Sequence, residues 1–159
     1  MNPIEHARRF SLFLARNLDS GRLNADILRA MTDKVLTEQD FHGFADWPGI
    51  LAAQDEETLA RKLRELRRYV VAQIMVRDLN RISDLNEVTR TITQFADFAV
   101  NTALDFAYAY YRDLYGTPIG RYTGEAQHLS VVAMGKAGGY ELNVSSDIDL
   151  IFVYPEAGE

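Results

Sequence analysis

Two carboxylates, Asp147 and Asp149, stand two residues apart at the start of an apolar segment. In a β-strand, side chains at positions i and i+2 point to the same face, so we expect these two to lie side by side. Neighbouring carboxylates repel each other unless a cation lies between them. Magnesium is commonly held by one or two carboxylates together with substrate phosphates. The pair therefore predicts a Mg²⁺ site for phosphoryl or nucleotidyl transfer, with both residues as metal ligands and catalytic residues.

A bare Asp-x-Asp also occurs on the solvated edge of a strand with alternating polar residues. The residues that follow favour the metal site. Leu150-Ile151-Phe152-Val153 is continuously apolar, which is typical of a strand covered on both faces. Carboxylates at the mouth of a buried strand need a partner, and the segment itself holds no lysine or arginine to supply one.

A glycine-rich turn precedes the carboxylates. Gly138 and Gly139 predict a turn at the start of a short helix, where backbone N–H groups can approach a phosphate, although turns alone explain many glycine pairs. Lys136 either offsets phosphate charge or is an exposed turn lysine. Ser146 either hydrogen-bonds a phosphate oxygen or caps the turn. These four are the predicted phosphate-binding residues.

The first 115 or so residues predict helices that position this segment. One begins at Asn2-Pro3, another covers about 24–36, and a long helix starts at Asp55. Its predicted buried face comprises Leu59, Leu63, Leu66, Val70 and Ile74. A capping box at Asp84 and Glu87 starts a second long helix that reaches about Tyr115. We expect the two long helices to pack antiparallel, with the arginines of 61–68 and Arg77 on solvated surfaces.

Glycines and a proline crowd residues 116–124, which is the composition of a linker. We therefore place a domain boundary there, with a helical region at 1–120 and a second unit at 121–159. The second unit predicts strands at 129–134 and 148–154, joined by a segment long enough for only a short helix. The predicted fold class is α+β.

Composition excludes several classes of function. The net charge of −6 and the pI near 5.1 argue against a nucleic-acid partner bound through a broad basic surface. The sequence has no cysteine, so disulfides and thiolate zinc sites are excluded, and its three histidines are scattered. We see no signal peptide and no apolar run long enough for a membrane helix. We expect a soluble, cytoplasmic protein without a membrane partner.

The segment Gly135–Phe152, with Glu141-Leu142-Asn143 and the double serine at 145–146, resembles the glutamine synthetase adenylyltransferase/adenylyl-removase family. That family belongs to the polymerase-beta-like nucleotidyltransferase superfamily. The helical part is also similar, at Arg77-Asp78-Leu79, at 84–88 and at Ala96-Asp97, so the likeness covers roughly 55–154. The double serine and the helical region near a starting methionine resemble the N-terminal, adenylyl-removing half.

The resemblance implies a reaction and its partners. In it, inorganic phosphate attacks the AMP group on a modified tyrosine of glutamine synthetase, and ADP leaves. Asp147 and Asp149 would hold Mg²⁺, while Gly138, Gly139 and Ser146 would position phosphates. The implied partners are glutamine synthetase, ATP or ADP, phosphate and a nitrogen-signalling regulatory protein.

Two departures qualify this expectation. Ala137 stands where the family usually has leucine, which we interpret as a packing change. The superfamily also needs a third carboxylate on a later strand, and Glu156 and Glu159 follow Pro155 too closely to supply it. We therefore expect a truncated nucleotidyltransferase domain that is inactive alone. Two alternatives stay open: the related uridylyltransferase/uridylyl-removing nitrogen sensor, and a helical interaction module with a non-catalytic nucleotidyltransferase-like domain.

Overall fold

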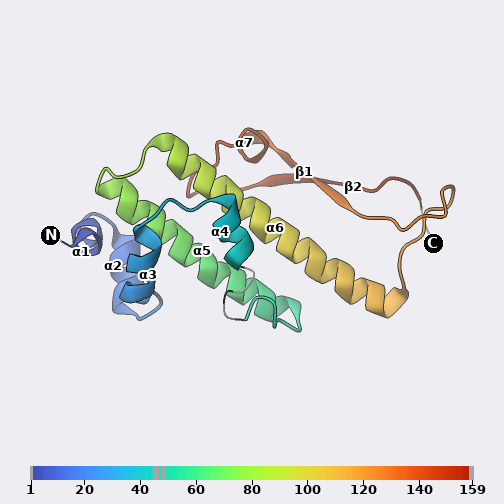
Figure 1. Ribbon diagram of the computed structural model, residues 1–159, viewed down its shortest axis with the longest axis horizontal. Helices are drawn as coiled ribbons and strands as arrows, with labels where there is room; N and C mark the ends of the chain where they lie inside the picture. The colour runs from blue at the N-terminus through green and yellow to red at the C-terminus, as the bar shows by residue number, and fades with distance from the viewer. Residues whose placement is uncertain (1, 45–46, 48, 158–159) are drawn as a thin grey trace.

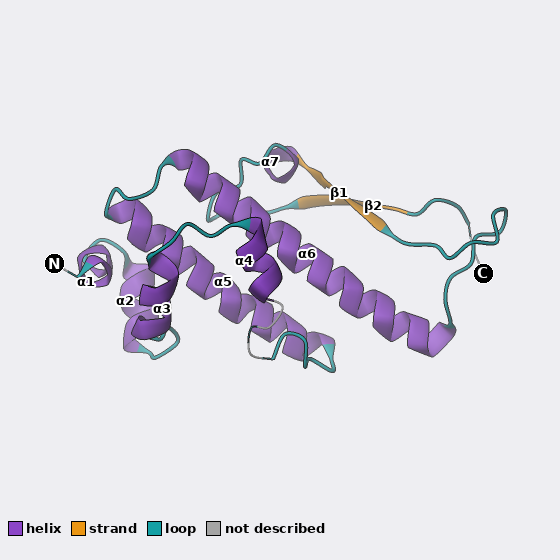
Figure 2. Cartoon of the chain, viewed as in Figure 1, coloured by secondary structure: helices purple, strands orange, loops and turns teal. Residues whose placement is uncertain are grey.

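The computed structural model describes residues 2–44, 47 and 49–157, in which helices come first and a pair of strands last (Figure 2). The elements are α1 (Pro3–Arg8), α2 (Leu12–Asp19), α3 (Ala25–Thr32), α4 (Glu38–Gly43), α5 (Glu56–Leu79), α6 (Leu85–Tyr115), β1 (Ser130–Met134), α7 (Gly135–Gly138) and β2 (Asp149–Val153). A mostly helical chain with a small antiparallel sheet is compatible with the predicted α+β class.

The long helices α5 and α6 lie side by side and antiparallel, as the sequence predicted (Figure 1). Asp55 caps α5 by accepting a hydrogen bond from the Thr58 N–H at 2.7 Å, and Asp84 caps α6 in the same way. The predicted apolar face of α5 is buried, with only Leu63 partly exposed. No helix in the described part of the chain is both long and apolar enough to cross a membrane.

The short helices cover the long pair. Helices α1 and α3 pack on α5, and α4 packs on α6, where Phe41 enters the core. Helix α4 lies in a stretch for which the sequence predicted no element. The sequence does hold a signal for this helix, a capping box formed by Thr37 and Asp40, in which the Asp40 carboxylate accepts a hydrogen bond from the Thr37 N–H.

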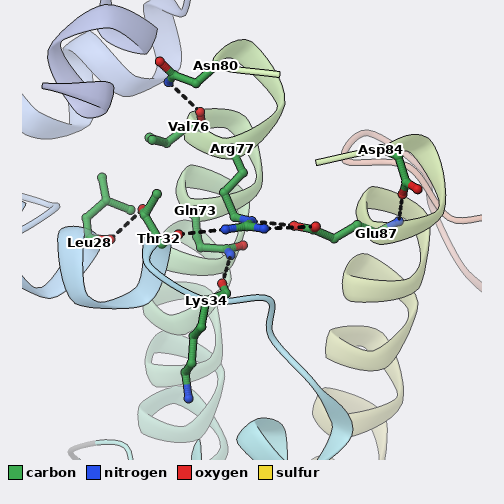
Figure 3. A network of polar contacts seen from close by, with 9 residues as sticks. All are labelled: Leu28, Thr32, Lys34, Gln73, Val76, Arg77, Asn80, Asp84 and Glu87. Carbon is green, nitrogen blue, oxygen red and sulfur yellow. Dashed lines mark hydrogen bonds and ion pairs between the residues drawn. The ribbon is translucent and has the colours of Figure 1, made fainter. Parts of the chain in front are cut away.

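A buried ion pair joins the helices (Figure 3). Arg77 was predicted on the helix surface, but only 8% of its side chain is exposed. Its guanidinium donates to both carboxylate oxygens of Glu87, at 2.5 and 3.1 Å, and to the Thr32 carbonyl at 2.9 Å. Glu87 therefore pairs with α5 instead of completing the predicted capping box with Asp84. The network connects α3, α5 and α6.

The strands β1 and β2 form an antiparallel ribbon that runs along α6 (Figure 1). Its register places Met134 opposite Asp149 and Ser130 opposite Val153. The expectation that β2 is covered on both faces is wrong for the described chain, because Ile151, Phe152 and Val153 are 48%, 59% and 45% exposed. Only the face with Val131, Ala133 and Leu150 lies toward α6, where these residues help line a small cavity.

Residues 116–129 carry the chain from the end of α6 into the ribbon (Figure 1). An isolated bridge joins Ile119 to Ala126 across a turn. The Glu156 carboxylate accepts hydrogen bonds from the Thr123 hydroxyl and from the backbone N–H groups of Tyr122 and Thr123. These bonds, the Thr123 hydroxyl first, lower the pKa of Glu156. The glycine-rich stretch is thus built into turns.

Candidate functional site

The two predicted carboxylates lie at one end of the ribbon, beside α7. Asp149 is the first residue of β2, while Asp147 precedes the strand in a loop, and both are exposed. The rule that places i and i+2 on one strand face therefore does not apply to Asp147. The Asp149 Oδ2 atom lies 3.8 Å from where a Cβ would stand at Gly135, so this carboxylate faces the glycine-rich turn.

The glycine pair closes α7 at its C-terminal end. The expectation that Gly138 and Gly139 start a short helix is wrong: the helix is Gly135–Gly138 and Gly139 is its C-cap. Packing explains the glycine at 138, since a Cβ there would stand 2.5 Å from the Ala133 carbonyl oxygen. Gly138 thus lets the chain turn tightly against β1, and a helix N-terminus does not support a phosphate role for the pair.

Tyr140 takes the left-handed conformation directly after the glycines, with φ of +58°, which is uncommon for a residue that carries a Cβ. Its backbone N–H donates to Ala137, and the next N–H, of Glu141, donates to Lys136 at 2.7 Å. These bonds fold the chain back over α7. The ring then extends to α6, where its hydroxyl donates to Asp97 Oδ2 at 3.3 Å.

The loop between α7 and β2 is anchored on the helices. Leu142 is only 1% exposed and belongs to the same hydrophobic cluster as residues of α5 and α6. Ala137 is buried in that cluster too. On the other side, Arg67 of α5 donates to the Val144 carbonyl at 2.9 Å. The arginine cluster of 61–68 therefore includes one member that binds the loop.

The polar residues of the loop bind one another. The Asn143 side-chain oxygen accepts from the backbone N–H and the hydroxyl of Ser145, at 3.1 and 3.0 Å. The Ser146 hydroxyl oxygen accepts from the Asn143 N–H at 3.3 Å, which is the capping role left open by the sequence. A hydroxyl that accepts this bond still has its hydrogen to donate. Lys136 is exposed on α7.

Asp97 stands out electrostatically. Burial raises the pKa of this half-buried carboxyl, the hydrogen bond from Tyr140 opposes the rise, and the negative charge of Glu38 adds to it. In turn, the Asp97 charge raises the pKa of Tyr140. In the sequence, Asp97 was notable only as part of the family resemblance, and neither Tyr140 nor Arg67 was predicted to belong to the site. Their signal is tertiary, because the three residues lie far apart in the chain.

The carboxylate oxygens of Asp147 and Asp149 are of the kind that Mg²⁺ binds together with substrate oxygens, and a magnesium site here stays a prediction. Within the described residues, no group of three or more histidine, cysteine, aspartate or glutamate side chains comes together to hold a metal. Asp147 and Asp149 by themselves match the habit of Mg²⁺, which uses one or two carboxylates and takes its remaining oxygens from water and phosphates. The exposure of both carboxylates leaves room for such partners.

Comparison with known proteins shows which family the sequence resembles. The family model for glutamate-ammonia ligase adenylyltransferase matches residues 11–159. A protein of Neisseria meningitidis serogroup B, named bifunctional glutamine synthetase adenylyltransferase/adenylyl-removing enzyme, is 77% identical over 158 residues, or 99% of this chain. Proteins of the same name from Chromobacterium violaceum and Nitrosomonas europaea are 48% and 43% identical, each over 94% of this chain.

These relatives are much longer. The chain spans 18% of the Neisseria protein and 16% of the other two. The matches favour the first of the two enzyme families considered from the sequence over the uridylyl-transferring one. Because the family model covers nearly the whole chain, including the glycine-rich turn and both carboxylates, the chain belongs to the glutamate-ammonia ligase adenylyltransferase family.

Proposed function

We propose that this chain contributes to an adenylyl-removing site that acts on glutamine synthetase. The observation that carries the proposal is the placement of Asp147 and Asp149, exposed at the end of the ribbon beside the glycine-rich turn, in a chain of this family. The relatives' names include both the transferring and the removing activity. The double serine at 145–146, which resembles the N-terminal copy of the motif, favours removal.

The proposed reaction is a phosphorolysis. A phosphate oxygen attacks the phosphorus of the tyrosyl-AMP group, the bond from phosphorus to the tyrosine oxygen breaks, and that oxygen takes up a proton. The products are ADP and the restored tyrosine. Asp147 and Asp149 would hold Mg²⁺, which when bound neutralises charge on the phosphate oxygens. The free hydrogen of the Ser146 hydroxyl can be donated to one of those oxygens, and Lys136 adds a positive charge nearby.

The partners follow from the reaction: adenylylated glutamine synthetase, phosphate and ADP, with ATP for the opposite, transferring activity. Regulation by a nitrogen-signalling protein stays a proposal, as does a cytoplasmic location. The superfamily resemblance also implies a third carboxylate. Glu156 is engaged by the turn at 122–123, which supports the view that the missing carboxylate comes from elsewhere. We therefore expect the 159-residue chain alone to release no ADP.

The test is phosphate-dependent release of ADP from adenylylated glutamine synthetase by the complete protein that contains this chain. Changing Asp147 and Asp149 together to asparagine should lower the rate at least about 1,000-fold, because the two charges that hold the metal are lost. Asp26→Asn with Asp113→Asn is the matched control, since it changes the same total charge at two exposed helix positions. Persistent activity in the first variant, with its fold intact by circular dichroism, would refute the metal assignment.

A further inference from the structure

The contact between Tyr140 and Asp97 joins the helical region to the loop that carries the candidate site. Tyr140 follows the glycine pair directly, and its left-handed backbone aims the ring at α6. The backbone bonds of the turn hold Tyr140 only locally, whereas its side chain contacts a different helix. Here the hydroxyl reaches a carboxylate 43 residues earlier in the chain, at 3.3 Å.

Asp97 sits between two hollows of the molecule. On one side is a cavity of about 260 Å³ whose lining includes Glu38 and Phe41 of α4 and the Tyr140 ring. On the other side is a cavity of about 120 Å³ between α6 and the ribbon, and its lining includes Ile148. Ile148 is the residue between the two candidate metal ligands. Asp97 therefore lines one cavity with Tyr140 and another with Ile148.

Three tethers hold the loop on the helices. The first is the bond from Tyr140 to Asp97 of α6, the second is buried Leu142, and the third is the bond from Arg67 of α5 to the Val144 carbonyl. Leu142 is held by burial, and Val144 also packs against the hydrophobic cluster. The two polar tethers lie on either side of Leu142 in the chain and restrict rotation of the backbone there. Catalytic groups must be held within about half an ångström of their productive geometry, so such tethers matter for rate.

We propose that the bond from Tyr140 to Asp97 is a positioning contact, through which α6 sets the glycine-rich turn and the loop that presents Asp147 and Asp149. The inference rests on the proposed function, since it assigns the contact to the same site. Neither residue touches the reacting atoms in this assignment. The contact acts by narrowing the range of loop conformations, so its loss affects the chemical step more than the binding of glutamine synthetase.

Hydrogen exchange measured on the complete protein tests the contact without relying on turnover. Tyr140→Phe and Asp97→Ala should each speed amide exchange in residues 138–146 about three- to tenfold, because one hydrogen bond that restrains the loop is lost. Tyr122→Phe and Asp105→Ala are the matched controls: Tyr122 lies in the turn at 122–123, and Asp105 lines the larger of the two cavities eight residues further along α6, whereas the Tyr140 hydroxyl donates to Asp97. Unchanged exchange in both test variants would overturn the proposal.

Kinetics of ADP release then separate positioning from a merely structural role. We expect kcat to fall about tenfold in Tyr140→Phe and Asp97→Ala, with KM for adenylylated glutamine synthetase within about twofold of wild type. Asp97→Asn keeps an acceptor oxygen and should retain more activity than Asp97→Ala. The double variant Tyr140→Phe/Asp97→Ala should be no slower than the slower single one, because both remove the same bond.

The outcomes distinguish the two proposals. A wild-type protein that releases no ADP refutes the proposed function, while the exchange measurement still decides the contact. Faster exchange with an unchanged kcat overturns the positioning role in an enzyme that is otherwise as proposed. Additive losses in the double variant also overturn it.

Discussion

At the scale of single residues, the two glycines at 138 and 139 meet different structural requirements. Gly138 is needed for space, because the Ala133 carbonyl oxygen of β1 occupies the place of a side chain. Gly139 has no such constraint: the nearest atom to a Cβ there, the Gly135 carbonyl oxygen, would lie 3.5 Å away. A sequence shows both only as glycine. The structural demand at Gly138 is therefore separable from any role in binding phosphate.

This difference predicts unequal effects of adding one methyl group. Gly138→Ala should destabilise the chain by about 1–3 kcal/mol, because backbone atoms of β1 or α7 must shift to admit the Cβ. Gly139→Ala, its neighbour and control, should stay within about 0.5 kcal/mol of wild type. Urea unfolding of both variants measures the difference. Equal stability of the two would mean that the turn relaxes freely around the new Cβ.

At the scale of elements, local signals predicted the long helices and both strands. The four- and three-residue steps from Leu59 to Ile74 match the buried face of α5, and Asp55 caps it as expected. The predicted strands at 129–134 and 148–154 agree with β1 and β2 to within one residue at each end. One error arose where a polar residue had two possible partners. Glu87 fits a capping box locally, but the guanidinium of Arg77 on the neighbouring helix binds it instead.

Because Arg77 and Glu87 form a buried ion pair, we expect the stability of the chain to fall strongly when Arg77 alone is lost. Arg77→Met should destabilise the chain by about 3–5 kcal/mol, because it leaves Glu87 buried without its counter-charge and the Thr32 carbonyl without its donor. The double variant Arg77→Met/Glu87→Leu removes both charges and should recover most of this loss. Thermal or urea unfolding of wild type, single and double variants gives the comparison. A double variant as unstable as the single one would show that the pair itself supplies the stability.

At the scale of the whole molecule, the helices and the motif form one packed body. Leu142 and Ala137 of the motif share a hydrophobic cluster with the helical core, and Asp97 and Arg67 bind the loop from two helices. The opposite face of the ribbon, with Val132 and Ile151, is open. Whether the boundary near residue 120 separates two independently folding domains stays a prediction.

The surroundings of Asp97 predict a pH dependence of stability. Its pKa is raised in the folded state, first by burial, so the folded chain binds this proton more tightly than the unfolded chain does. The wild type should therefore lose stability relative to Asp97→Asn as pH rises from about 3.9, the unfolded value, through the folded pKa, and the difference should then level off. Glu38, His42 and Asp105 line the same cavity and are unchanged in both proteins.

Urea unfolding of wild type and Asp97→Asn between about pH 2.5 and pH 7 measures this difference. Asp55→Asn provides a contrast, because hydrogen bonds from Thr58 lower the pKa of Asp55. At that position the wild-type advantage should be present above about pH 3.9 and shrink as pH falls through the folded pKa. A stability difference between wild type and Asp97→Asn that does not vary with pH would contradict the burial of this carboxylate.

Patterns in the sequence were enough to predict the periodic helices, the two strands, most helix caps and the motif with its two carboxylates. All of these depend on neighbours within a few residues, where periodicity and local hydrogen bonding decide the outcome. The motif also sufficed to name the family. Three features became visible only in the folded chain: Asp97 and Arg67 bind the motif loop, Glu87 pairs with Arg77, and Gly138 leaves space for β1. Each of those contacts joins residues that packing brings together, so the spacing of these residues in the chain does not predict the contact.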